Sequence, residues 1–299
     1  MIEQPIKQVF GSPGGKTYLA SRIVGMIPPH ETYVEPFAGG AAVYFKKAPS
    51  GKEVLSDKDK DIAFALKFLR NMTPEQFRRL KRYDWRISGK TFNRLKASQP
   101  KDDVERFRRF YYLKKGSYGY GSKEPNLAAS GDNISIDHLP KAHDRLSKTA
   151  VHGRDAIAII KKYDSPSTFF YLDPPYPGRT FIGSRNEDKY TNEDLARLID
   201  QLRHIKGKFA LSLGTEHANL LPKDWLIKRV GVRRRLSIKY FGERPLQYEI
   251  IATNYRPATK GQIFRPILAT RKRVIARRKT QSRRKNHHPV VPSLVGIRI

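Results

Sequence analysis

The chain has 299 residues, with 59 Lys and Arg against 28 Asp and Glu, which gives a formal net charge of +31. A chain of this length can bury a core without disulfide or metal cross-links, so a mini-protein is excluded. The positive charge is far larger than solubility requires and indicates a polyanionic partner, with nucleic acid as the first candidate. The lack of cysteine excludes a disulfide framework, a Cys-ligated zinc site, an iron–sulfur cluster and a cysteine nucleophile.

The hydropathy of the chain favours a globular protein outside the membrane. Hydrophobic residues make up 38% of the sequence, which is enough for a folded core. No apolar run approaches the roughly 20 residues that span a bilayer, and the N-terminal MIEQPIKQVF lacks an apolar signal core. We therefore expect a cytoplasmic protein of a bacterial cell or a phage-infected host, without a membrane partner.

Short apolar runs alternate with helical patterns in the first and third parts of the chain. The runs typical of strands are residues 33–35, 53–56, 167–172, 209–213 and 249–254. The segments with helical spacing are 39–45, 61–69 and 191–202. Because strands and helices alternate, we predict an α/β fold with a mostly parallel sheet.

A glycine turn follows the first strand. Residues 35–40 (EPFAGG) join that strand to a helix, and Asp57 lies 18 positions after Gly39, at the end of the next strand. Glycines allow close approach of a ligand to the backbone, and a carboxylate on the second strand accepts hydrogen bonds from ribose hydroxyls. A full GxGxxG is absent, so an adenosine-containing ligand without phosphates fits better than NAD. The alternative is a tight turn in which Asp57 only caps the following helix.

The tetrapeptide 173–176 (DPPY) follows the strand 167–172, at the end where open α/β sheets place their active sites. The Asp173 carboxylate and the Pro174 carbonyl can accept hydrogen bonds from an exocyclic amine. Pro175 stiffens the backbone, and the Tyr176 ring can stack on a planar base. This combination indicates a clamp for a ring that bears an amine, and a surface turn is the alternative.

At these residues the sequence resembles the Dam-like N6-adenine DNA methyltransferases, which use S-adenosylmethionine. Residues 11–16 (GSPGGK) are similar to the family's N-terminal glycine–lysine motif, residues 35–40 to its cofactor loop, and residues 173–176 match its catalytic tetrapeptide without substitution. The resemblance covers about 1–70 and 150–256. It implies a Rossmann-like, S-adenosylmethionine-dependent methyltransferase sheet with a helical target-recognition insertion.

The resemblance also implies roles for individual residues. The catalytic set would be Asp173, Pro174, Pro175 and Tyr176. The cofactor-binding set would be Lys16 on the methionine carboxylate, Phe37 and Gly39 lining the cofactor, Asp57 on the ribose, and Asp155 near the adenine. For Asp155 a helix cap is the alternative role. No metal is implied.

The middle of the chain carries basic residues interleaved with aromatic ones. We predict that residues 1–71 and 150–256 form the catalytic domain and that residues 72–149 form a DNA-recognition insertion. Its candidate DNA-binding residues are Arg78, Arg79, Arg108, Arg109, Lys114 and Lys115. The aromatic residues of 106–115 either stack on bases or form the core of an amphipathic helix. The family's usual loop after this helix is replaced by GYGSKEPNLAASG, so the sequence leaves the bases that are read undetermined.

Two further segments are polar or basic. Residues 177–189 either close over a flipped base or form a plain connection. From residue 256 onward the chain has 13 basic and no acidic residues, and we expect 257–299 to be a flexible tail that adds DNA affinity. A tail without a role is the alternative.

The sequence therefore predicts a monomeric, site-specific DNA methyltransferase. It would move a methyl group from S-adenosylmethionine to the N6 amine of an adenine that is flipped out of double-stranded DNA. The alternatives are a methyltransferase for RNA adenine or DNA cytosine N4, and a catalytically inactive nucleic-acid-binding protein. A protein-glutamine methyltransferase is a weaker alternative, because it would not need a charge of +31.

Overall fold

The computed structural model describes residues 6, 8–11, 14–117, 120, 122–178, 190–232 and 246–257. The helices outside residues 72–149 are α1 (Ala20–Val24), α2 (Ala42–Lys46), α3 (Lys60–Asn71), α8 (Ala156–Tyr163), α9 (Asn192–Arg203) and the 3-10 helix η4 (Thr215–Leu220). The helices of 72–149 are α4 (Pro74–Lys81), α5 (Gly89–Ala97), α6 (Asp103–Gly116), η2 (Leu127–Ala129) and α7 (Leu139–Leu146). Most of the expected loop 177–189 and all but the first residue of the expected tail 257–299 lie outside the described residues.

A seven-stranded sheet forms the centre of the fold. Its strands are β1 (Thr32–Glu35), β2 (Lys52–Ser56), β3 (Ala150–His152), β4 (Thr168–Leu172), β5 (Lys208–Gly214), β6 (Leu226–Val232) and β7 (Gln247–Thr253). The order across the sheet is β3-β2-β1-β4-β5-β7-β6. The five strands from β3 to β5 pair in parallel, and β7 is antiparallel to both β5 and β6. The predicted Rossmann-like α/β sheet is confirmed.

The five strands predicted from apolar runs are β1, β2, β4, β5 and β7. The two that the sequence did not indicate are β3 and β6, which lie at the two edges of the sheet. β3 has three residues, and β6 has the sequence LIKRVGV, so neither forms a continuous apolar run. Edge strands are buried less than central ones, which weakens the signal that the prediction uses.

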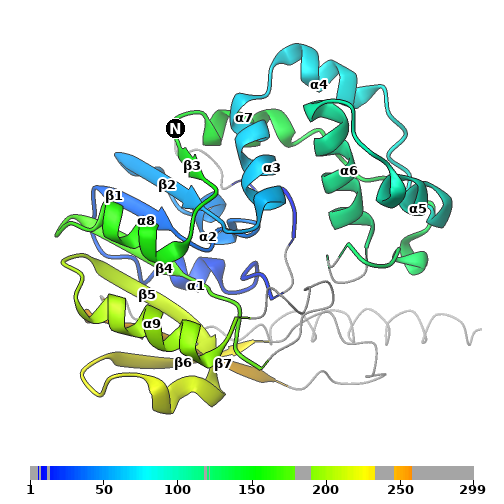
Figure 1. Cartoon of the computed structure of the whole chain (residues 1–299). Helices are drawn as coiled ribbons and strands as arrows, with labels where there is room; N and C mark the ends of the chain where they lie inside the picture. The colour runs from blue at the N-terminus through cyan, green and yellow to red at the C-terminus, as the bar shows by residue number, and fades with distance from the viewer. Residues whose placement is uncertain are drawn as a thin grey trace, which may run out of the picture. The chain divides into compact units, whose positions relative to one another are not determined.

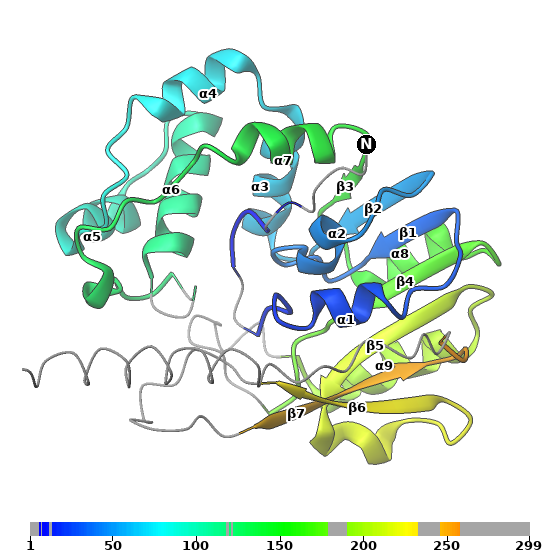
Figure 2. The same cartoon turned by 180° about the vertical axis from the view of Figure 1, so that it is seen from behind.

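Helices cover both faces of the sheet, and the alternation of side chains along each strand supplies a core to each face. Val34 and Phe170 point to the face covered by α8 and α9. Tyr33 and Phe169 point to the opposite face, which α1 and α2 cover (Figures 1 and 2). The sheet is therefore buried on both sides, as parallel sheets require.

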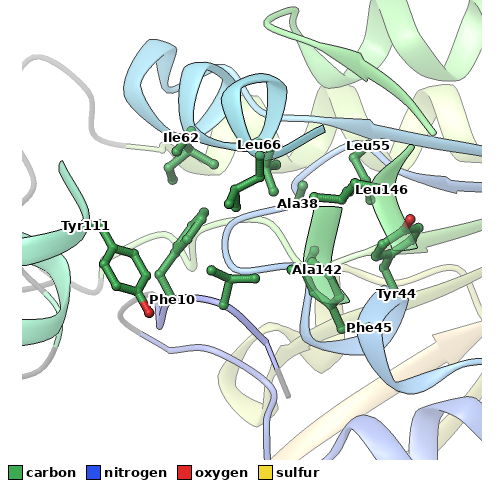
Figure 3. Close-up of a cluster of buried hydrophobic side chains, with 14 of the residues drawn as sticks. Phe10, Ala38, Tyr44, Phe45, Leu55, Ile62, Leu66, Tyr111, Ala142 and Leu146 are labelled. Atoms are coloured by element: carbon green, nitrogen blue, oxygen red, sulfur yellow. The ribbon is translucent and has the colours of Figure 1, made fainter. Parts of the chain in front are cut away.

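The helices of residues 72–149 share a hydrophobic core with the sheet. Phe107 of α6 stacks on Phe68 of α3 with the ring centroids 4.5 Å apart, and on Tyr111 at 5.5 Å. Figure 3 shows Tyr111 directed toward Phe10, close to Ile62 and Leu66 of α3. Buried residues from α3, α6 and α7 belong to one hydrophobic cluster. The buried aromatic residues of α6 therefore form part of the core, as expected for an amphipathic helix.

A buried ion-pair network fixes the end of this helical segment to the sheet. Arg145 of α7 donates to both carboxylate oxygens of Glu53 on β2. Lys47 donates to Glu53 Oε1 at 2.6 Å, and the Arg145 guanidinium lies 3.9 Å from the centre of the Tyr44 ring. The bidentate geometry and the shared carboxylate satisfy charges that would be costly to bury alone. This network therefore fixes the end of α7, from which the chain returns to the sheet at β3.

The shared core predicts that the helical segment and the sheet unfold together. Phe107→Ala should lower the free energy of unfolding by about 3 to 5 kcal/mol, because it leaves a cavity between two buried rings. Urea unfolding should still show one transition, by circular dichroism and by the fluorescence of Trp85 in the insertion and Trp225 beside the sheet. Lys90→Ala, at an exposed position of α5, is the matched control and should change stability by less than about 0.5 kcal/mol. An additional early transition of the insertion alone would contradict the shared core.

Candidate functional site

The two motifs predicted from the sequence meet at one edge of the sheet. The turn 35–40 follows β1, and the tetrapeptide 173–176 follows β4, and these two strands are parallel neighbours. Their carboxyl ends therefore lie side by side. The strand order reverses between β1 and β4, because β2 follows β1 on one side and β5 follows β4 on the other. Open α/β sheets bind their ligands at such a reversal.

The turn after β1 has a backbone that glycine makes possible. Gly39 has a φ of 47°, in the left-handed region. A Cβ atom at Gly40 would lie 2.2 Å from the Phe10 carbonyl oxygen, so only glycine fits there. The Gly39 amide donates to Asp57 Oδ2 at 2.8 Å, which joins the turn to the end of β2.

Asp57 is a carboxylate held by backbone amides. Its Oδ1 accepts from the Asp59 amide at 2.9 Å, in addition to the bond from Gly39. Burial raises the pKa of Asp57 to about 6, although both amides and the nearby Lys114 lower it. Asp59, and not Asp57, caps α3 by accepting from the amides of Asp61 and Ile62. The capping alternative for Asp57 is therefore not what the geometry shows.

The carboxylate of the tetrapeptide is paired with a buried lysine. Lys16 Nζ lies 2.6 Å from Asp173 Oδ1 and also donates to the Gly14 carbonyl at 3.2 Å. Lys16 is 5% exposed, whereas the Asp173 side chain is 19% exposed. The N-terminal motif thus reaches the end of β4 through one ammonium group, and Asp173 keeps an accessible surface.

A second buried carboxylate, Glu249 of β7, approaches the same lysine. Glu249 Oε2 lies 3.6 Å from Lys16 Nζ and accepts a hydrogen bond from the Tyr176 hydroxyl at 3.3 Å. Lys16 Nζ also lies 5.0 Å from the centre of the Tyr176 ring. Lys16, Asp173, Tyr176 and Glu249 therefore form one polar cluster at the edge of the sheet, called the Lys16 cluster below.

Glu35, the last residue of β1, lies beneath this cluster. Its Oε1 accepts from the Tyr33 hydroxyl at 2.5 Å and from the Tyr44 amide at 2.7 Å. Burial raises the pKa of Glu35 to about 8, and the charge of Asp173 adds to this rise. Near neutral pH, Glu35 is therefore mostly protonated, which limits the negative charge at the edge of the sheet.

Three residues approach one another on the other side of the β1 turn. The Phe37 ring meets the Tyr190 ring edge to face, with centroids 6.1 Å apart. Burial raises the pKa of Tyr190, and the charges of Asp194 and Asp155 add to it, so Asp155 lies within electrostatic reach of this ring. Asp155 itself accepts from the Ile157 amide at 2.9 Å and caps α8, which is the alternative role given above.

The candidate DNA-binding residues of α4 carry ion pairs at the surface. Arg78 donates to Glu75 Oε2 at 2.6 Å, and its side chain is 65% exposed. Arg79 donates to Asp102 Oδ2 at 2.7 Å, which joins α4 to the start of α6. Exposed ion pairs contribute little to stability, so both guanidinium groups can exchange these partners for phosphates at little cost.

The candidates on α6 make closer contacts within the protein. Arg109 donates to the carbonyls of Leu95 and Lys96 at the end of α5. The Arg108 guanidinium lies 4.0 Å from the centre of the Tyr83 ring. Burial lowers the pKa of Lys114, and the three acidic residues that oppose this are Asp57, Asp59 and Asp61. Lys114 thus faces the end of β2, where these acidic residues lie. Lys115 Nζ lies 5.6 Å from the centre of the Tyr111 ring.

The sequence analysis missed three of the residues that complete this site. Glu249 lies 73 positions after Tyr176, and only the register of β7 places it at the site. Tyr190 lies just before α9 and belongs to none of the motifs. Glu35 was part of a recognised motif, but no role was assigned to it. A lone acidic residue at the start of the apolar run 250–252 is a signal that could have indicated Glu249.

Within the described part of the chain, no group of His, Asp and Glu is arranged to hold a metal ion. None of its helices combines the length and the apolar character needed to cross a bilayer.

Comparison with known proteins identifies the family. The model of the D12 class N6 adenine-specific DNA methyltransferase family matches residues 12–236 of this chain. This range includes the turn after β1, the whole helical segment and the tetrapeptide after β4.

Three relatives are Type II methyltransferases. M.CviBI of Paramecium bursaria Chlorella virus NC1A is 27% identical over 215 residues, covering 67% of this chain and 80% of its own. M1.LlaDCHI of Lactococcus lactis subsp. cremoris is 26% identical over 269 residues, covering 81% of this chain and 93% of its own. M.MjaIII of Methanocaldococcus jannaschii is 24% identical over 282 residues, covering 81% of this chain and 96% of its own.

The raised pKa of Glu35 predicts a pH dependence of stability. Its ordinary pKa is 4.5, so between about 4.5 and 8 the native state holds a proton that the unfolded state releases. The free energy of unfolding should therefore fall as pH rises through this range, by on the order of 1 kcal/mol per pH unit from this group. Glu35→Gln removes the titration, and its stability should change less between these limits. Urea unfolding of both proteins across this range measures the difference, and parallel pH profiles would contradict it.

Proposed function

Because this chain belongs to the D12 class N6 adenine-specific DNA methyltransferase family, we propose that its methyl donor is S-adenosylmethionine and that residues 173–176 hold the target adenine. The chain is an adenine-specific DNA methyltransferase by its family, and the family favours DNA adenine over the RNA and cytosine alternatives. The observation that carries the site assignment is the meeting of the β1 turn and the β4 tetrapeptide at the reversal of strand order.

The groups around the β1 turn are chemically suited to this cofactor. A carboxylate fixed by two backbone amides, as Asp57 is, can accept hydrogen bonds from ribose hydroxyls. Phe37 offers an aromatic surface, Asp155 lies within electrostatic reach of the Tyr190 ring that meets Phe37, and Gly39 leaves the backbone accessible. Lys16 supplies the positive charge that a methionine carboxylate needs. When bound, the cofactor supplies a methyl group that its positive sulfur already activates.

The chain's own residues then have to position the target amine. Asp173 and the Pro174 carbonyl would accept its two N–H groups, which directs the nitrogen lone pair at the methyl group. Tyr176 would stack on the base, and Pro175 would hold the backbone. Alignment of the reacting atoms, without a strong base, is sufficient for a methyl donor of this kind.

Such a site requires the adenine to leave the duplex. The N6 amine of a stacked base cannot reach the edge of the sheet, so base flipping at a cost of a few kcal/mol is part of the proposal. Arg78 and Arg79 are the candidates for phosphate contacts on double-stranded DNA, because their ion pairs lie at the surface and are easily exchanged. Arg108, Arg109, Lys114 and Lys115 stay in the proposed set with their protein contacts.

The wider organisation is also proposed. The catalytic domain comprises residues 1–71 and 150–256, the recognition insertion 72–149, and the basic tail 257–299 adds sequence-independent affinity through its phosphate contacts. We further propose that the enzyme acts as a monomer in the cytoplasm.

The decisive test is methylation of DNA in a methylation-deficient host. Expression of the chain should introduce N6-methyladenine at one sequence context, which sequencing of the genomic DNA identifies together with the base. Asp173→Ala should reduce methyl transfer about 100-fold or more, because the amine loses its acceptor and its position. Calorimetry should show that the variant still binds S-adenosylmethionine. Loss of cofactor binding together with activity would refute the proposed division of roles.

The raised pKa of Asp57 predicts a pH dependence of cofactor binding. The ionised carboxylate is the better acceptor, so affinity for S-adenosylmethionine should weaken as pH falls below about 6, by up to about tenfold per pH unit. Asp57→Asn should bind about 1 to 3 kcal/mol more weakly at neutral pH and lack this dependence. Calorimetry between pH 5 and 8 measures both. Equal pH profiles for the two proteins would show that Asp57 does not bind the cofactor.

A further inference from the structure

Glu249 lies at the active edge of the sheet because of the direction of β7. In the register of the sheet, Glu249 is opposite Gly214, the last residue of β5. β7 runs antiparallel to β5, so the start of β7 lies at the same edge as the ends of the parallel strands. Glu249 is 2% exposed, and Ile250, Ile251 and Ala252 follow it in the core. The strand therefore places one carboxylate where an apolar side chain would otherwise begin the buried run.

A carboxylate at this position is not explained by stability. Removal of a charge from water is costly, and a well-packed apolar residue is commonly as stable as a buried ion pair. The polar contacts of Glu249 instead include two at one oxygen, with the Lys16 ammonium at 3.6 Å and the Tyr176 hydroxyl at 3.3 Å. Both belong to the residues proposed to bind cofactor or target, so the position of Glu249 points to the reaction.

The charges of the Lys16 cluster indicate what the Glu249 carboxylate does. In the structure Lys16 lies 1.0 Å closer to Asp173 than to Glu249, at 2.6 against 3.6 Å. When the target amine donates to Asp173, it competes with Lys16 for that carboxylate. A buried ammonium gives up one anion at a lower cost when others are in reach. Glu249 is an anion that the protein itself supplies, in addition to the methionine carboxylate proposed to bind Lys16.

We infer that Glu249 is a positioning residue of this methyltransferase: its carboxylate keeps Lys16 and the Tyr176 hydroxyl in place while Asp173 turns to the target amine. Glu249 does not touch the reacting atoms. It acts through Lys16, which it retains, and through Tyr176, whose ring it orients. This inference rests on the proposed role of residues 173–176.

The test uses Glu249→Gln in the full chain, with Glu53→Gln as a matched control. Both changes neutralise a buried glutamate that pairs with a lysine, but Glu53 pairs with Lys47 away from the site. Transfer of tritium-labelled methyl from S-adenosylmethionine to unmethylated genomic DNA should show kcat lowered about 10-fold to 100-fold for Glu249→Gln. The Kd for S-adenosylmethionine should rise by a smaller factor than kcat falls, because Asp173 still holds Lys16 before the target amine binds. Glu53→Gln should keep kcat per folded molecule.

A second measurement reports on Lys16 without requiring methyl transfer. Competitive acetylation with acetic anhydride, read by mass spectrometry, measures how readily each lysine amine reacts. A lysine amine that loses one of two carboxylate contacts is held less firmly in place, so Glu249→Gln should raise the labelling of Lys16 and not that of Lys47. Glu53→Gln should do the reverse.

The outcomes separate the inference from the proposed function. If the original chain methylates DNA and Glu249→Gln matches its kcat, the positioning role is overturned. If the labelling of Lys16 is unchanged in Glu249→Gln, the contact that carries the inference is refuted, with or without DNA methylation. If the original chain transfers no methyl group to DNA, the proposed function fails, and the positioning role fails with it.

Discussion

The parallel pairing of β1 with both β2 and β4 is the constraint on which the site depends. It brings the ends of three strands to one edge, and with them Glu35, Asp57 and Asp173, although 138 positions separate the first from the last. Three carboxyl groups so close would repel one another. The structure resolves this in three ways: Glu35 holds a proton, Asp57 binds two backbone amides, and Asp173 binds a lysine. Each solution leaves that carboxyl group in a different chemical state.

The same need for partners governs the charges away from the site. Lys47, Glu53 and Arg145 are buried together, and no member of this network could be buried alone at reasonable cost. The exposed arginines of α4 differ, because water already solvates them and their carboxylate partners are easily exchanged. Burial thus separates the chain's many cations into those that hold the fold together and those available to a polyanion.

Local signals explain what the sequence could predict. Apolar runs bounded by turn residues located the five buried strands, and the motifs at the ends of β1 and β4 indicated where the chemistry lies. The edge strands β3 and β6 lack such runs. The contacts of Lys16 with Asp173 and Glu249 depend on three separate segments meeting, which no local pattern records. For α6, spacing allowed both base stacking and core packing by its aromatics, and Phe107 and Tyr111 are fully buried. Only the presence of α3 beside them decides between the two.

The stacked rings of Phe68, Phe107 and Tyr111 have a consequence for how this enzyme could diverge. A helical segment that shares its core with the sheet cannot be exchanged as a cassette, because a foreign segment would have to reproduce the aromatic contacts as well as the Arg145 bond to Glu53. Substitutions at solvent-facing positions of α4 and α5 avoid this constraint. The interior of the segment can therefore change only together with the sheet, whereas its outer surface can change on its own.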